Sequence, residues 1–302
     1  MELITDTRQM QRWADATRAQ GQRISLVPTM GYLHAGHLSL VSQAQRRCDV
    51  TVASIFVNPL QFGSNEDLDC YPRDVKRDAQ LLTEAGTTVL FLPDTRMMYP
   101  DGFQTTVKVE QVTRGLCGAA RPTHFRGVTT VVLKLFHIVK PHVAVFGMKD
   151  FQQLVAIRQM VSDLNMDIEI VGAPIVREPD GLAMSSRNAY LSTAERQAAR
   201  CLVEGLAAAA ALVQRGETDG LRILAAARRV ITDEPLARLE YATLADPETL
   251  EGVSTVCAPT LLALAVYIGK TRLIDNCILS RESTVEGRRL EAAREASVRG
   301  AS

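Results

Sequence analysis

The sequence predicts an α/β protein: a Rossmann-like, doubly wound parallel sheet followed by a smaller α+β domain. Short apolar runs of strand length alternate with helix-length segments through the first 176 residues. Apolar residues dominate each run, which is typical of a parallel sheet covered on both faces. After about residue 176 the pattern changes to an alanine-rich helical stretch followed by further strand-like runs.

The elements of the first part follow from apolar periodicity and from the residues that interrupt it. Pro93, for example, ends the third apolar run. We expect strands over 24–27, 50–56, 88–92, 143–146 and 168–171. We expect helices over 38–45, 74–85, 124–139 and 152–163.

In the second part, Ser192 and Glu195 form a capping box that opens a long helix ending near residue 214. A helix over 221–231 and strands over 239–244, 260–267 and 272–278 follow. We therefore expect a catalytic domain over 1–176 and a small lid domain over 177–281. Residues 282–302 are charged and poor in apolar side chains, and we expect a disordered tail there.

The composition argues against nucleic-acid and membrane partners. The 302 residues contain 34 Lys and Arg against 34 Asp and Glu, so no basic excess favours nucleic acid as a partner. Six scattered cysteines without metal-ligand spacing indicate reduced thiols. The N-terminus has no apolar signal region, and the longest apolar run is too short to span a bilayer. We expect a soluble, cytoplasmic protein with no membrane partner.

The run from Pro28 to His37 is the most informative segment of the chain. It follows a predicted strand and precedes a predicted helix, so its two histidines lie where the helix begins. A helix N-terminus presents free N–H groups and a partial positive charge, which favour phosphate. His34 and His37 are three residues apart and share one side of the first turn, and Gly36 leaves room for a ligand. The segment predicts a polyphosphate pocket.

Other interpretations of the histidine pair are open. A short His-x-x-His pattern arises by chance, and two histidines at this spacing can share a zinc ion. A zinc site needs a third ligand, however, and His124, His137 and His142 stand in no recognisable ligand spacing. We therefore rank a metal below a nucleotide.

Polar side chains also follow two other predicted strands, at the sheet edge where such folds bind ligands. Lys149 can neutralise phosphate, or it and Asp150 can be solvated charges on a turn. Asn58 and Gln61 can offer amides to a substrate, or they can cap a helix. Further along, the run Met-Ser-Ser-Arg at 184–187 can wrap phosphates with two hydroxyls and a guanidinium, although it is also ordinary loop material.

Together these segments resemble the pantothenate synthetase (pantoate–β-alanine ligase) family of HIGH-motif nucleotidyltransferases. The matching pieces, in order, are PTMGYLHAGHLSLV, SIFVNPLQF, YPRD, RPTHFRGV, VFGMKDFQQL and VREPDGLAMSSRNAYL. The resemblance implies an ATP-dependent ligase that joins (R)-pantoate to β-alanine through an enzyme-bound pantoyl adenylate. It also implies Mg²⁺ with the ATP, and a homodimer.

Carried onto this sequence, the resemblance implies catalytic roles for His34, His37 and Lys149, with His37 as a proton donor. It implies pantoate and β-alanine contacts for Gln61 and a pantoate contact for Gln153, and Asp78 is a candidate carboxylate near the metal. The residues that it places against ATP are Met30, Gly31, Tyr32, Leu33, His34, Ala35, Gly36, His37, Gly147, Met148, Lys149, Asp150, Val176, Met184, Ser185, Ser186 and Arg187.

Two alternative functions are considered. A related nucleotidyltransferase acting on another small acid would share the nucleotide site, but a phosphorylated acceptor would favour additional basic residues over the amides of Gln61 and Gln153. A non-catalytic ATP-sensing module would not need His34, His37 and Lys149 together with an arginine in the loop at 184–187.

Overall fold

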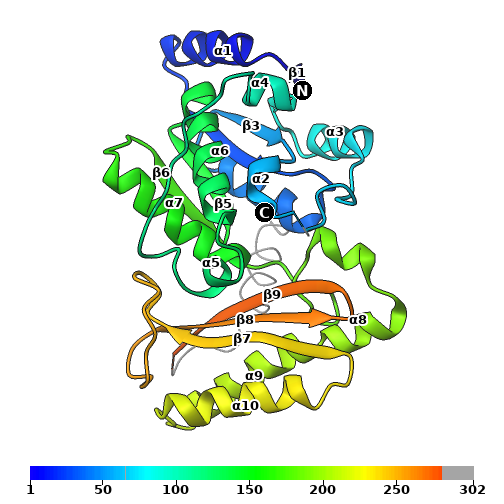
Figure 1. Ribbon diagram of the computed structural model, residues 1–302. Helices are drawn as coiled ribbons and strands as arrows, with labels where there is room; N and C mark the ends of the chain where they lie inside the picture. Colours follow the sequence, from blue (N-terminus) through cyan, green and yellow to red (C-terminus); the bar gives the residue numbers. More distant parts are fainter. Residues whose placement is uncertain (65, 281–302) are drawn as a thin grey trace, which may run out of the picture. The chain divides into compact units, whose positions relative to one another are not determined.

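The computed structural model describes residues 1–64 and 66–280, which form two compact units (Figure 1). The first unit comprises residues 1–176 together with 184–186. Of the described residues, the second comprises 177–183 and 187–280. The tail expected over 282–302 lies outside the described residues.

The first unit is built on a six-stranded sheet in the order β1-β4-β3-β2-β5-β6, and every neighbouring pair is parallel. The chain moves outward from β2 through β3 to β4 and then returns to β5 on the other side of β2. The edge of the sheet at β2 and β5 is therefore a topological switch point, where such folds bind ligands. The strands are β1 (Glu2–Ile4), β2 (Ile24–Thr29), β3 (Val50–Ile55), β4 (Val89–Phe91), β5 (Val143–Gly147) and β6 (Glu169–Ala173).

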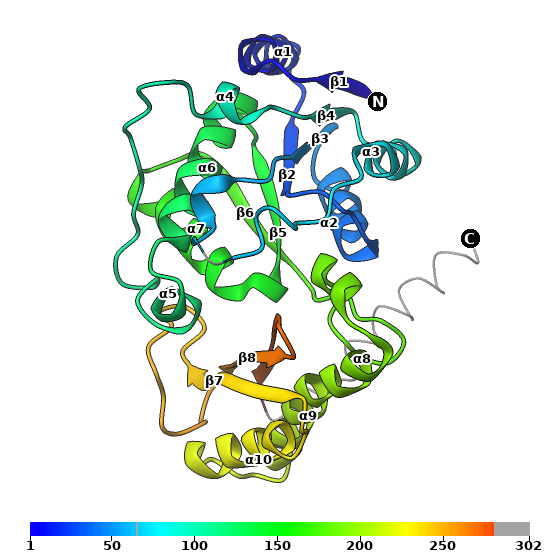
Figure 2. The same cartoon turned by 45° about the vertical axis from the view of Figure 1, so that its right-hand side comes forward.

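Helices cover both faces of this sheet. α2 and α3 lie on one face, and α6 and α7 lie on the other (Figure 2), as right-handed crossover connections require. α1 packs against α6. Fully buried side chains from α2, α3 and the sheet, such as Val41, Leu82 and Val145, form a common core. The helices are α1 (Thr7–Ala19), α2 (Ala35–Gln45), α3 (Val75–Glu84), α4 (Thr95–Met98), α5 (Leu116–Ala120), α6 (His124–Val139) and α7 (Phe151–Asp163). The predicted fold class is confirmed.

The structure contains two elements, β1 and α1, that are not predicted from the sequence. β1 has only three residues, too few to show a strand pattern, and it is a strand because it pairs with β4 at the edge of the sheet. α1 is capped by Asp6, whose carboxylate accepts a hydrogen bond from the Gln9 N–H at 2.7 Å. This is an ordinary N-cap, although no element is predicted there from the sequence.

The second unit packs helices on an antiparallel sheet in the order β7-β8-β9. Its elements are α8 (Thr193–Ala199), α9 (Cys201–Gln214), α10 (Gly220–Thr232), β7 (Ala237–Ala245), β8 (Thr260–Ile268) and β9 (Thr271–Leu279). The capping box of Ser192 and Glu195 is confirmed. The single long helix predicted after it is wrong, because the chain tightens at Arg200, whose N–H donates to the Gln197 carbonyl three residues back.

No helix within the described residues is long and apolar enough to cross a membrane. The six cysteines, all of which lie in the described part of the chain, form no disulfide bond with one another.

Candidate active site

The N-terminus of α2 carries the two histidines of the sequence motif, and both are tied to the backbone. His34 is the N-cap, and its Nδ1 accepts a hydrogen bond from the Gly36 N–H at 3.2 Å. Nδ1 of His37 accepts one from the His34 N–H at 3.3 Å. The ring centroids are 4.1 Å apart. Because Nδ1 is an acceptor in each ring, each neutral imidazole carries its hydrogen on Nε2.

The charge state of His37 is set by its surroundings. Burial, and then electrostatic interactions with His34 and Lys149, lower the pKa of His37 to about 3. His37 is therefore neutral at neutral pH, and it is a hydrogen-bond donor through Nε2 rather than a standing cation. An anion placed against this ring would favour its protonated form electrostatically, and it would raise the pKa of His37.

Lys149 comes from the strand next to β2. It lies in a 3₁₀ turn, η2 (Met148–Asp150), directly after Gly147, the last residue of β5. β5 pairs in parallel with β2, so the turn after β5 and the motif after β2 meet at the same edge of the sheet. The structure thus brings His34, His37 and Lys149 together.

Asp78 holds the loop that leads into α2. Its Oδ2 accepts a hydrogen bond from the Tyr32 N–H at 2.6 Å, and its Oδ1 accepts one from the Leu33 N–H at 2.8 Å. These bonds fix Tyr32 at φ +52°, a left-handed conformation that costs a non-glycine residue energy. Burial raises the pKa of Asp78, while the two N–H groups and Arg77, at 3.8 Å, oppose this rise.

This arrangement bears on the predicted metal role of Asp78. Both carboxylate oxygens are already occupied by backbone N–H groups, which supports a loop-positioning role rather than a ligand role. Within residues 1–64 and 66–280, no three His, Cys, Asp or Glu side chains are grouped so that they could hold a metal ion.

The segment 184–186 belongs to the same compact unit as the motif. The Ser186 hydroxyl donates to the Tyr32 carbonyl at 3.2 Å, and the Met184 N–H donates to the Val176 carbonyl at 3.0 Å. The hydroxyl of Ser186 is therefore anchored on the motif loop. Arg187, the next residue, is counted with the second unit.

Gln61 lies in a 3₁₀ turn, η1 (Pro59–Gln61), after β3, and its side chain is buried. Its Nε2 contacts Sδ of Met30, a motif residue, at 3.1 Å, and its Oε1 accepts from Asn58 Nδ2 at 3.1 Å. The structure therefore connects the amide predicted to bind substrate with the motif. Of the two glutamines in the first turn of α7, Gln152 donates to the Val112 and Gly115 carbonyls, whereas Gln153 is half-buried.

The backbone of Gln61 is held by two residues to which the sequence pattern gives no role. His124 Nδ1 donates to the Gln61 carbonyl at 2.9 Å, and Arg121 Nη2 donates to it at 3.2 Å. Arg121 is in turn paired with Glu66, its Nε lying 2.7 Å from Oε1. Burial, followed by the charge of Arg121, lowers the pKa of His124 to about 4, so this ring is neutral.

Ring and basic side chains are dense over 121–127, and this is the feature of the sequence that marks Arg121 and His124. The pattern does not reveal what the two residues do, because the carbonyl that they contact lies about 60 residues earlier in the chain. Asp78 is separated from its partners in the same way, by 46 and 45 residues.

Comparison with known proteins shows the same family that the sequence motifs resemble. A profile of the pantoate-beta-alanine ligase family matches residues 2–278. The chain is 57% identical over 282 residues to the pantothenate synthetase of Geobacter sulfurreducens, covering 93% of this chain and 100% of the relative. It is 57% identical over 279 residues to the pantothenate synthetase of Syntrophobacter fumaroxidans, covering 92% of this chain and 99% of the relative.

Solved structures agree with these relatives. The pantothenate synthetase of Thermus thermophilus matches with a TM-score of 0.87 and 44% identity, over 92% of this chain and 99% of that chain. The pantoate-beta-alanine ligase of Francisella tularensis, complexed with beta-gamma ATP and beta-alanine, matches with a TM-score of 0.77 and 33% identity. That match covers 94% of this chain and 99% of the other.

Proposed function

The chain belongs to the pantoate–beta-alanine ligase family, and from this premise we propose that it joins (R)-pantoate to β-alanine at the expense of ATP. The observation that carries the proposal is the grouping at the N-terminus of α2 of two Nε2–H donors, His34 and His37, beside Lys149. Two ring N–H donors at a helix N-terminus, beside the ammonium group of Lys149, are suited to a polyphosphate.

In the first half-reaction, a pantoate carboxylate oxygen attacks the α-phosphorus of ATP. The bond from that phosphorus to the bridging oxygen breaks, and pyrophosphate leaves with the electron pair. Negative charge grows on the phosphate oxygens in the transition state, where fixed donors such as His37 Nε2–H and Lys149 are most effective. Met184, Ser185, Ser186 and Arg187 would close over the phosphates, and Val176 would meet the adenine.

In the second half-reaction, the β-alanine amine attacks the carbonyl carbon of the pantoyl adenylate. The carbon–oxygen bond to the phosphate breaks, AMP leaves, and the new ammonium loses a proton to give the amide. No protein nucleophile is required, so positioning can supply much of the acceleration. Gln61 and Gln153 would hold the pantoate for both steps.

We propose that Mg²⁺ accompanies the ATP. Magnesium usually binds substrate phosphates and waters with few protein ligands, and the residues around α2 are consistent with an ion carried by the nucleotide. When bound, it would neutralise phosphate charge. We also propose a cytoplasmic homodimer, with residues 1–176 as the catalytic domain and 177–281 as a separate smaller domain.

The test is a two-stage assay of the purified protein. With ATP, magnesium and pantoate, we expect a burst of pyrophosphate that depends on pantoate. AMP and the amide should appear only after β-alanine is added. If no pyrophosphate is released with pantoate but another small acid releases it, the proposed substrate is wrong.

A further inference from the structure

A chain of hydrogen bonds leads from Tyr99 to Gln61. The Tyr99 hydroxyl donates to Oδ1 of Asn58 at 2.7 Å, and Nδ2 of Asn58 donates to Oε1 of Gln61 at 3.1 Å. Asn58 is 1% exposed, so water does not compete for these bonds. Tyr99 follows α4 directly, 41 residues after Asn58 in the sequence.

The backbone fixes the direction of this chain. Oδ1 of Asn58 also accepts from the Leu60 N–H at 3.3 Å, and Nδ2 also donates to the Gly127 carbonyl at 3.1 Å. An N–H can only donate and a carbonyl can only accept, so the amide of Asn58 has one possible orientation. Oε1 of Gln61 must then be the acceptor, and its Nε2 is left as the donor end, against Sδ of Met30 at 3.1 Å.

The ring of Tyr99 is itself held firmly. Its centroid lies 4.9 Å from that of Phe103 and 6.0 Å from that of Phe56. Nζ of Lys134 lies 5.0 Å from the Phe103 centroid and 5.9 Å from that of Tyr99. Burial raises the pKa of the Tyr99 hydroxyl, so it keeps its proton and remains a donor to Asn58.

We propose that Tyr99 is a positioning residue for the acid substrate: acting through Asn58, it holds the Gln61 amide with its N–H end toward the substrate. A site built in this way selects a ligand oxygen that accepts a hydrogen bond, as the carboxylate and hydroxyl oxygens of a hydroxy acid do. The inference rests on the proposed function, and it adds a residue that does not itself contact the substrate.

The test begins with Tyr99→Phe, which removes the hydroxyl and keeps the ring. A hydrogen bond contributes about 1 kcal/mol net, so we expect the KM for pantoate to rise about fivefold. The KM for ATP should be unchanged. The matched control is Tyr267→Phe, which removes a hydroxyl from β8 in the second unit, where the ring stacks against Arg238 at 4.1 Å; its KM for pantoate should equal that of the wild type.

A double-mutant cycle separates positioning from a general structural effect. If Tyr99 acts through the Gln61 amide, Tyr99→Phe should have no further effect on the pantoate KM in a Gln61→Ala background. An equal rise in both backgrounds, or an equal rise in the ATP KM, overturns the proposal. Should Gln61→Ala be too inactive to assay, the side-chain amide NMR signal of Gln61 decides: it should shift in Tyr99→Phe, and an unmoved signal overturns the proposal. Wild-type protein that releases no pyrophosphate with pantoate would instead contradict the proposed function.

Discussion

Gly127 on α6 gives a quantitative test of how Gln61 is positioned. A Cβ added at this position would lie 2.3 Å from the Leu60 carbonyl oxygen and 2.5 Å from the Gln61 nitrogen. Real Cβ atoms essentially never lie closer than 3.0 Å to a heavy atom outside their own residue and its chain neighbours. Gly127→Ala therefore forces α6 and η1 apart by about 0.7 Å, from 2.3 Å to at least 3.0 Å.

The shift has two calculable consequences. Overpacking of this kind destabilises a protein by about 1–3 kcal/mol. Misplacement of a positioning group by about 1 Å lowers the rate about 100-fold, so we expect kcat/KM for pantoate to fall roughly 10- to 100-fold. The Asn58 bond to the Gly127 carbonyl, 3.1 Å long, should also be lost.

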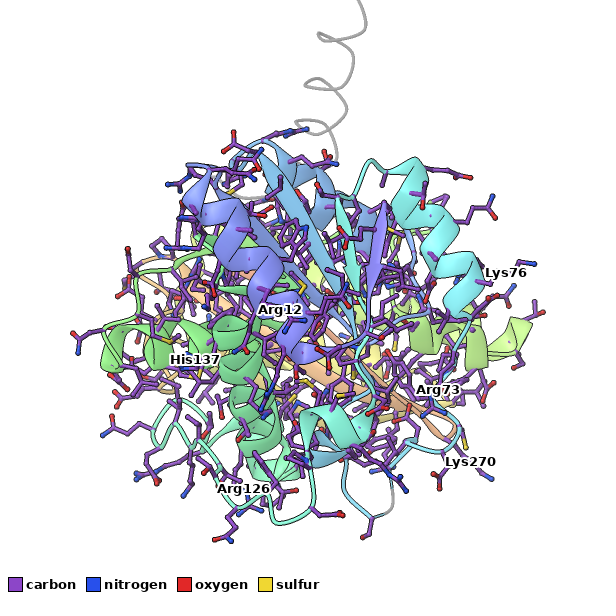
Figure 3. All side chains as sticks on the ribbon, turned by 90° about the horizontal axis from the view of Figure 1, so that it is seen from above. Arg12, Arg73, Lys76, Arg126, His137 and Lys270 are labelled. Carbon is purple, nitrogen blue, oxygen red and sulfur yellow. The ribbon has the colours of Figure 1, made fainter. Side chains whose placement is uncertain are left out.

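The assay is pantoate-dependent pyrophosphate release, measured at saturating ATP, with thermal unfolding of the same samples. Gly115→Ala is the matched control, because its added Cβ would meet no atom within 4 Å and its φ is −90°. Arg126→Ala is a second control, since this side chain extends into solvent from α6 (Figure 3). A folded Gly127→Ala protein with wild-type pantoate kinetics would refute the argument that Gln61 is positioned by this contact.

Three further predictions concern the motif and the second unit. In Gly36→Ala, the added Cβ would lie 2.9 Å from Nδ1 of His34, so the cap should be lost at a cost of about 1 kcal/mol and the KM for ATP should rise; an unchanged ATP dependence would contradict this. Because the pKa of His37 is lowered from 6.5 to about 3, the unfolded chain binds more protons below pH 6.5, and stability should fall as the pH drops from about 6.5 toward 3. The melting temperature of His37→Gln should fall less between pH 7 and pH 5 than that of the wild type, and parallel curves would exclude His37 as a cause. Asp275→Ala removes the buried carboxylate that pairs with the partly buried Arg177 at 2.6 Å, so chemical denaturation of the protein should show a loss of about 3 kcal/mol, at the lower end of the range for buried pairs.

Local pattern was sufficient for much of the fold. Strands such as Val50–Ile55 and Val143–Gly147 were predictable because apolar and β-branched residues dominate each run. The start of α8 was predictable because a capping box is a local interaction between Ser192 and Glu195. β1 was not predictable, because three residues carry no period and pairing with β4 makes the strand.

The sequence by itself determined the parallel sheet and the place of His34 and His37 at the start of a helix. Both depend on residues only a few positions apart, whose periodicity and capping are written in the chain. Only the tertiary structure decided what holds the site in place: Asp78 on the motif loop, His124 and Arg121 on the Gln61 carbonyl, and Tyr99 on Asn58. These contacts join side chains to groups 41 to 63 residues away. The backbone groups that Asp78, His124 and Arg121 contact are alike at every position, and the Asn58 amide that Tyr99 contacts is distant in sequence, so tertiary packing and not local pattern sets these partners.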